Sequence, residues 1–233
     1  MEAFLRKNIF GIYWIIVAVS CCLLFLNPLL SSVFELLFVP LLLTFLFLND
    51  PDIGRPTGKF IFYVGLFLAF MGDFLQVVID NRLFFVISII AYLLMNICYG
   101  TCFYSLHPVK KGNRKVFGMS LLVSGIIGAV ICWWLWGVIE GFRSAVIVYV
   151  AAVNLVIAAA FHLSTDPAYR RLALRYIIPA CLLQVIQNVL LISNMMFWGA
   201  KPALYAFSMI PYAVVQYLFV KGFWYLFLTG KKL

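Results

Sequence analysis

The stretch IFGIYWIIVAVSCCLLFL, from Ile9 to Leu26, contains no charged side chain. A helix that spans a bilayer needs about 20 consecutive, mostly apolar residues, so this stretch is long enough to cross. The whole chain has the same character, with 66% hydrophobic residues, 11% charged residues and a mean hydropathy of +1.08. Soluble domains carry about 25% charged residues. We therefore predict an all-α, polytopic membrane protein whose apolar side chains are solvated by lipid.

Further apolar runs follow to the end of the chain, and short segments with Pro, Gly, Asn or Asp separate them. They predict about eight transmembrane helices in one bundle, which form a single domain over residues 1–233. The number falls to seven if two short hairpins do not fully insert. The predicted helices span residues 9–26, 30–48, 59–79, 83–106, 115–138, 144–163, 174–195 and 202–221.

The basic residues orient this bundle. If the N-terminus lies in the cytoplasm, only Arg82, Arg143 and Lys201 of the 17 lysines and arginines fall on the opposite side. Cytoplasmic loops of membrane proteins are enriched in Lys and Arg, so we predict that the N- and C-termini are both cytoplasmic. The net charge of +9 follows from this asymmetry and does not indicate nucleic-acid binding. The cytoplasmic residues are Arg6, Lys7, Arg55, Lys59, Lys110, Lys111, Arg114, Lys115, Arg170, Arg171, Arg175, Lys221, Lys231 and Lys232.

Two acidic residues lie within the predicted spans. The chain has only eight acidic residues, and the two are Glu35 and Asp73. Ionisable side chains inside a membrane are energetically costly, face the protein interior and usually serve a function. At 1.5 Å per residue, both carboxyls lie about 10 Å below the outer boundary. We expect them to meet and to be catalytic; the alternative is that they tie helices together by hydrogen bonds.

Other polar side chains fall at similar or greater depth along single helix faces. They predict a polar pocket in the outer half of the bundle, where they orient substrate and water. The alternative is hydrogen bonding between helices, which is worth about 0.6 kcal/mol per contact. The candidates are Asn96 and Tyr99 in the fourth helix, Gln187 and Asn188 in the seventh, and Tyr212 and Gln216 in the eighth.

No metal or cofactor site is predicted. The six cysteines lie within apolar stretches, where cysteine acts as a small buried hydrophobe. His162 is expected at the cytoplasmic end of the sixth helix as an interfacial residue, and His107 lies in a basic loop. The chain has no nucleophile motif, phosphate-binding loop or zinc-ligand spacing.

The segment GLFLAFMGDFL at residues 65–75, with the run that continues to Tyr99 and Phe103, resembles the YhhN-like lysoplasmalogenases. Its most specific element is the pair Gly72-Asp73. The similarity covers most of the chain, including the rhythm of eight spans. It therefore implies a membrane-embedded enzyme of this family.

Further positions match or depart from the family pattern. Pro40 in the second helix matches, as does the pair Tyr212 and Gln216 in the eighth. Members of the family usually have Lys before that proline, His in the fourth helix and Ser-Asp in the seventh, where this chain has Val39, Asn96 and Ile186-Gln187. The chain therefore lacks the second aspartate that the family uses with the first.

The resemblance implies hydrolysis of the vinyl ether bond of lysoplasmalogens to a fatty aldehyde and a glycerophospho-base. Acid activates a vinyl ether by protonating its β-carbon, and water captures the resulting oxocarbenium ion. This needs a carboxyl that is protonated near neutral pH, which burial and a second nearby carboxyl favour. We expect Asp73 to be the acid and Glu35 to stabilise the cation or orient the water, with Gln187 and Asn96 as further water-orienting groups.

The expected partner is a lysophospholipid in the bilayer, with its headgroup phosphate near Arg82, Arg143 or Lys201. Two other hypotheses are a weakened or inactive relative that binds a lysolipid, and a small-molecule transporter that uses Asp73 as a proton site. Gln187 in place of the family's aspartate favours the lysolipid-binding relative. The absence of a visible sequence repeat counts against the transporter. The sequence indicates neither the headgroup preference nor the oligomeric state.

Overall fold

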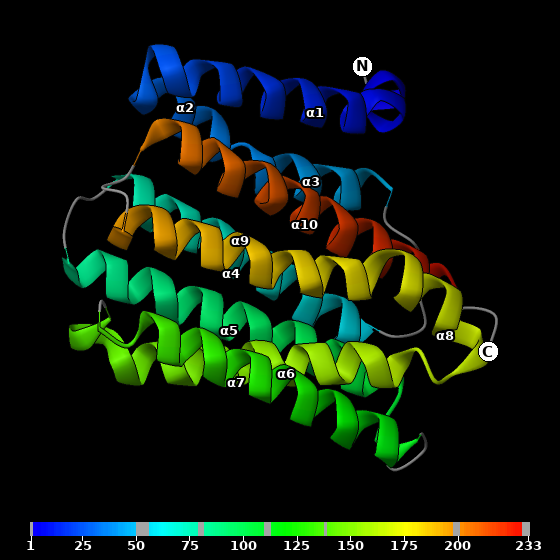
Figure 1. Cartoon of the computed structure of the whole chain (residues 1–233). Helices are drawn as coiled ribbons and strands as arrows, with labels where there is room; N and C mark the ends of the chain where they lie inside the picture. The colour runs from blue at the N-terminus through cyan, green and yellow to red at the C-terminus, as the bar shows by residue number, and fades with distance from the viewer. Residues whose placement is uncertain are drawn as a thin grey trace.

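The computed structural model describes residues 2–49, 56–78, 82–109, 113–137, 139–197 and 201–229. These residues form helices joined by short connections, with no strand among them (Figure 1). Eight helical stretches in the described ranges are long and apolar enough to cross a membrane, so the predicted all-α, polytopic fold is confirmed. The α-helices are α1 Glu2–Leu26, α2 Pro28–Glu35, α3 Phe38–Leu48, α4 Pro56–Val78, α5 Arg82–Leu106, α6 Arg114–Leu135, α7 Arg143–Leu163, α8 Pro167–Leu172, α9 Ile178–Phe197 and α10 Pro202–Thr229.

The predicted boundaries agree within a few residues for the third to sixth helices and differ at both ends of the chain. Helix α1 begins at Glu2 rather than Ile9, and α10 continues past Lys221 to Thr229. Lys221 lies within this helix, and its ammonium group lies 4.8 Å from the ring centroid of Phe10. The predicted end points at residues 79 and 138 lie outside the described residues.

The predicted second helix, 30–48, is two helices, because the helical winding is interrupted at Leu36 and Leu37 between α2 and α3. Pro40 explains the position of the break. Its ring has no N–H to donate to the carbonyl of Leu36 four residues earlier, and it crowds that carbonyl. The break makes Glu35 the last residue of α2.

The predicted seventh helix, 174–195, begins earlier and changes its winding. The chain passes from α8 through a π-helical segment, η2 (Ala173–Ile177), into α9. At the end of this segment the N–H of Ile178 donates to the carbonyl of Ala173, five residues back. Pro179, which follows, removes a backbone donor, and such positions are typical sites of local helix distortion.

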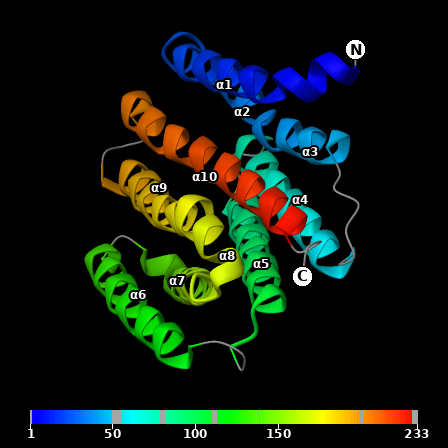
Figure 2. The same ribbon diagram turned by 90° about the vertical axis from the view of Figure 1, so that its right-hand side faces the viewer.

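Consecutive helices pack as hairpins, with α4 on α5, α6 on α7 and α9 on α10 (Figure 2). A short 3₁₀ turn, η1 (Glu140–Phe142), leads into α7. The start of α1, the end of α10 and the α7–α8 connection lie at one end of the bundle, on the right in Figure 1. We call this the terminal end and the opposite end the far end.

An aromatic core fills the half of the bundle nearer the terminal end. The ring of Phe223 on α10 stacks on Phe62 of α4 and on Phe103 of α5, with centroids 3.8 and 5.1 Å apart. Along α4, Phe62 is eleven residues before Asp73, or about 16 Å at 1.5 Å per residue. The polar site described below therefore lies beyond this core, toward the far end.

Candidate active site

Asp73 is a buried carboxyl held by hydroxyls from two other helices. The Tyr92 hydroxyl of α5 donates to Oδ1 at 2.6 Å, and the Tyr212 hydroxyl of α10 donates to Oδ2 at 2.5 Å. Only 6% of Asp73 is exposed. Each carboxyl oxygen thus has one phenol partner, and the site joins three helices.

Gly72 gives the Gly72-Asp73 pair a physical reason. A Cβ atom on Gly72 would lie 2.7 Å from ring atoms of Tyr92, closer than two carbon atoms approach without a shift. The absence of a side chain on Gly72 therefore lets the Tyr92 ring pack against α4, where its hydroxyl reaches Asp73.

Glu35 is held in a similar way at the break between α2 and α3. The Tyr205 hydroxyl of α10 donates to Glu35 Oε2 at 3.0 Å. One turn earlier, the hydroxyl of Ser31 donates to the carbonyl of Ser20 at 2.8 Å, and the hydroxyl of Ser20 donates to the carbonyl of Ser31 at 2.9 Å. These bonds fix α2 against α1 and so set the position of Glu35.

Helix α10 brings the two carboxyls into one site. Tyr205 and Tyr212 are seven residues apart, which is two helical turns, so they project from one face about 10 Å apart along the axis. Both carboxyls line the same cavity. Tyr205 was absent from the residues predicted from the sequence, although its spacing from Tyr212 is the signal that could have identified it.

A layer of amide side chains borders the carboxyls. Gln184 donates to Asn96 Oδ1 at 3.1 Å, and Asn188 donates to the hydroxyl of Tyr149 at 3.0 Å. Gln184, Gln187 and Asn188 line the cavity. The side-chain oxygens of Gln184 and Gln216 are buried without a hydrogen-bond partner among the described residues. Each is therefore a buried acceptor that the described residues leave unpaired beside the cavity.

Two predicted site residues, Asn96 and Tyr99, lie behind the residues that line the cavity. Asn96 is fully buried and donates to the carbonyl of Tyr92 at 2.8 Å. Tyr99 belongs to the aromatic core, with its ring 4.9 Å from that of Phe219. Neither residue lines the cavity, so each can act only through its neighbours.

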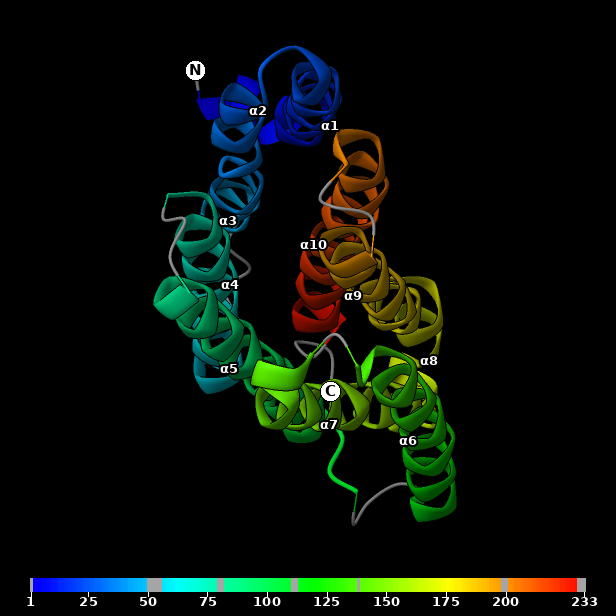
Figure 3. The same ribbon diagram turned by 60° about the vertical axis from the view of Figure 1, so that its left-hand side comes forward.

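The cavity has a volume of about 730 Å³, within the range of about 300–1,000 Å³ that is typical of ligand pockets. Its polar lining includes the two carboxyls and the amides of α9, and Ser120, Ser124 and Asn154 add polar groups along α6 and α7. The rest of the cavity is an arm lined mainly by apolar residues of α6, α7 and α9. Figure 3 shows α6 and α7 together at one side of the bundle, with α9 beside them. The arm is lined by Met119, Val123, Ile127, Ile131 and Leu135 of α6, Val146, Val150, Val153, Ile157 and Phe161 of α7, and Leu182, Ile186 and Val189 of α9. The site thus combines buried acids with space for a hydrocarbon.

The three predicted headgroup residues have different surroundings. Arg143 at the start of α7 donates from Nε and Nη2 to the carbonyl of Trp136, at 3.3 and 3.2 Å. It adjoins Phe142, which lines the cavity. Lys201 is exposed at the start of α10. The side chain of Arg82 lies outside the described residues.

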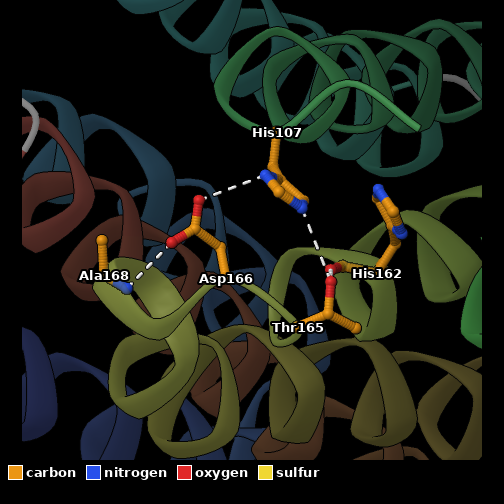
Figure 4. A network of polar contacts seen from close by, with 5 residues as sticks. All are labelled: His107, His162, Thr165, Asp166 and Ala168. Carbon is orange, nitrogen blue, oxygen red and sulfur yellow. Dashed lines mark hydrogen bonds and ion pairs between the residues drawn. The ribbon is translucent and has the colours of Figure 1, made fainter. Parts of the chain in front are cut away.

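A second polar cluster, formed by His107, His162 and Asp166, lies at the terminal end, and Figure 4 shows it from close by. We call it the histidine cluster. His107 Nδ1 lies 3.1 Å from Asp166 Oδ2, and the ring of His107 stacks on that of His162 with centroids 4.8 Å apart. Asp166 also caps α8 by accepting from the N–H of Ala168 at 2.9 Å. His162, predicted as interfacial, is buried, and its ring nitrogens have no hydrogen-bond partner among the described residues. None of these side chains lines the cavity.

No metal site emerges from the part of the chain that the structure describes, since no three His, Cys, Asp or Glu side chains are grouped there to hold an ion. The comparisons with known proteins give one match. The family model described as the YhhN family matches residues 30–223. No curated protein and no solved structure matches the chain.

Proposed function

The chain belongs to the YhhN family, and we propose that it is a membrane-embedded hydrolase that cleaves the vinyl ether bond of lysoplasmalogens. The products are a fatty aldehyde and a glycerophospho-base. The observation that carries the proposal is the single cavity that joins the buried Asp73 and Glu35 to an apolar arm. A lipid with one hydrocarbon chain and a labile group next to that chain has matching chemistry.

The reaction begins with transfer of a proton from the carboxyl of Asp73 to the β-carbon of the vinyl ether. The C=C π bond breaks, a C–H bond forms, and the positive charge is shared by the α-carbon and the ether oxygen. Water then adds to the α-carbon and returns a proton to the Asp73 carboxylate, which gives a hemiacetal. The hemiacetal collapses as its C–O bond to glycerol breaks, its hydroxyl loses a proton to form the aldehyde, and the glycerol oxygen gains a proton to leave as the alcohol. One water is consumed, and one alcohol and one aldehyde are released.

The two tyrosines suit an acid that must lose and regain a proton. A phenol hydroxyl can donate one hydrogen bond and accept others. Tyr92 and Tyr212 can therefore hold Asp73 both as a carboxylate and as a neutral acid. The side chain of Gln187, which lines the cavity, is placed to orient the attacking water.

Glu35 is proposed to stabilise the oxocarbenium ion. Two carboxyls that divide the work of proton transfer and cation stabilisation are the established logic of glycoside hydrolysis, which passes through a similar cation. The bond from Tyr205 holds Glu35 on the cavity wall. Arg143, beside the cavity-lining Phe142, is the best placed of the predicted residues to meet a headgroup phosphate.

The proposed orientation has both termini in the cytoplasm, because most basic residues fall at the terminal end of the bundle. The carboxyl site then lies in the outer half of the membrane. Gly112→Cys tests this with an impermeant thiol reagent and the unmodified chain as control. We expect labelling only after permeabilisation; ready labelling in intact cells would reverse the orientation.

The test of function is aldehyde release by the purified protein in lipid nanodiscs. We expect aldehyde from an alkenyl lysophospholipid and none from the matched saturated alkyl lysolipid, which has no double bond to protonate. Absence of aldehyde from the alkenyl lipid would contradict hydrolysis.

Gln187 supports a second candidate, a relative that binds a lysolipid without turnover. It lines the cavity at the position where the family usually has an aspartate. Saturable binding of the alkenyl lysolipid without aldehyde release would favour this candidate.

A further inference from the structure

The apolar arm of the cavity has a shape that the proposed chemistry does not by itself require. We infer that the arm binds the hydrocarbon chain of the lipid substrate, that the chain enters sideways from the bilayer between α6 and α9, and that Phe161 limits its length. This inference rests on the proposed function and adds a chain-length specificity to it.

The length of the arm fits one lipid chain. On α7, the residues that line the cavity run from Val146 to Phe161. The part that extends toward the terminal end is bounded by Tyr149, which accepts a hydrogen bond from Asn188 of the amide layer, and by Phe161. These residues are twelve positions apart, or about 18 Å along the axis at 1.5 Å per residue. One leaflet of a bilayer, half of a hydrocarbon core of about 30 Å, is about 15 Å deep. An extended chain that starts at the carboxyls therefore has room to lie along the arm.

The arm opens on the lipid-facing side. On α6, Met119, Val123 and Ile127 line the cavity and are also 63%, 49% and 51% exposed. They are four residues apart and form one stripe. On α9, Leu182 and Ile186 likewise line the cavity and are 47% and 51% exposed. Side chains that face both the cavity and the surface form the two rims of a side opening.

The wall between the rims is closely packed where α6 meets α7. A Cβ atom on Gly128 would lie 2.7 Å from Val150 Cγ1 and 2.9 Å from Asn154 Nδ2, so the two helices touch there. The Ser124 hydroxyl, also in the wall, donates to the carbonyl of Leu121 in its own helix at 3.4 Å. It therefore makes little polar demand on a hydrocarbon in the arm.

The histidine cluster closes the terminal end of the arm. The ring of Phe117 on α6 meets that of His162 on α7 edge-on, with centroids 5.9 Å apart. His162 directly follows Phe161 and is stacked on His107. Helices α6 and α7 thus converge just beyond Phe161, which makes this residue the end of the space available to a chain.

The test uses binding as well as turnover, so that the arm and the reaction can fail separately. A series of saturated alkyl lysophospholipids of increasing chain length, which cannot be hydrolysed, would compete with a fluorescent lysolipid for the protein in nanodiscs. Ile157→Trp fills the middle of the arm, and Leu155→Trp, on the same helix but exposed and outside the cavity wall, is the matched control.

We expect Ile157→Trp to raise the Kd of the long-chain lipids at least about tenfold, because overpacking a filled site is costly. The Kd of short-chain lipids for Ile157→Trp should stay unchanged. The Kd of every lipid for the control variant, Leu155→Trp, should also stay unchanged. Phe161→Ala should shift the preference toward longer chains in binding and, in the active protein, in aldehyde release. The shift in binding without aldehyde from any protein would support the arm and overturn the hydrolase.

Two results would overturn the inference. The first is an unchanged chain-length profile in Ile157→Trp and Phe161→Ala, each folded as judged by its melting temperature. The second is a change of oligomeric state in Ile157→Trp, which would indicate that a second copy of the chain covers the groove.

Discussion

The carboxyl site and the histidine cluster are both polar groups in an apolar bundle, and they differ in what surrounds them. Asp73 accepts hydrogen bonds from tyrosine hydroxyls of α5 and α10, and it lines a cavity. Asp166 binds His107 and caps α8, in a cluster where the helices converge and no side chain lines the cavity. A polar residue inside a membrane bundle is thus a candidate for chemistry when it has both distant partners and adjacent space. The rarity of polar residues in an apolar bundle does not by itself distinguish the carboxyl site from the histidine cluster.

The largest loss of turnover, and so the clearest difference between the carboxyl site and the histidine cluster, is expected for Asp73→Asn. Asn keeps the size and one carbonyl acceptor but cannot deliver the acidic proton. General acid catalysis is typically worth about 10²–10⁴-fold in rate, and the loss should appear in kcat of aldehyde release. The melting temperature should change little, since both tyrosine hydroxyls still find partners. Undiminished turnover would remove Asp73 from the role of acid.

A smaller loss is expected for Glu35→Gln. Water and neighbouring dipoles can partly replace a group that stabilises a cation, so kcat should fall by about tenfold, less than for loss of the general acid. Tyr205→Phe is the matched control, because it leaves the Glu35 carboxyl in place and removes only its hydrogen bond. If Glu35→Gln costs as much as Asp73→Asn, the division of roles between the two carboxyls is wrong.

Gln187→Asp tests whether the site is weakened by the departure from the family pattern. The substitution places a third acid on the cavity wall and should raise kcat severalfold. Gln187→Asn, which is shorter but uncharged, controls for the change in size. A fall in kcat of Gln187→Asp with a normal Kd for the alkyl lysolipid would show that the amide is the functional group.

The smallest effect is expected at the histidine cluster. Asp166→Ala removes the cap of α8 and the partner of His107, and loss of an N-cap typically costs about 1 kcal/mol of stability. The melting temperature should fall by a few degrees, and kcat per folded molecule should stay unchanged. A loss of turnover like that of Asp73→Asn would erase the distinction between the two clusters.

The sequence was sufficient for the spans and for the two buried acids, because lipid solvation imposes length and charge rules on every helix. Two further features of the sequence correspond to the geometry of the site. Pro40 marks the break that ends α2 at Glu35, and the spacing of Tyr205 and Tyr212 marks one face of α10. The sequence predicts a polar pocket, but it does not predict the apolar arm of the cavity, because the arm depends on which faces of α6 and α9 remain apart. That is a property of tertiary packing rather than of any single helix.

The roles of Asn96 and Tyr99 show the same limit. Both lie on the face of the fourth helix that carries Tyr92, and the pattern places all three toward the interior. The structure places Asn96 behind Tyr92 and Tyr99 in the aromatic core. Periodicity identifies a buried face, but it does not tell a cavity wall from a packed layer one turn away.

Protonation at carbon is tested most directly by hydrolysis of an alkenyl lysophospholipid in D₂O, with immediate reduction of the aldehyde to an alcohol and mass spectrometry of the product. Transfer of the Asp73 proton to the β-carbon predicts one deuterium at carbon 2 of the fatty chain. The authentic aldehyde, incubated with the Asp73→Asn protein and reduced in the same way, measures exchange without catalysis. Product from the wild-type protein with no more deuterium than this control would contradict the proposed reaction.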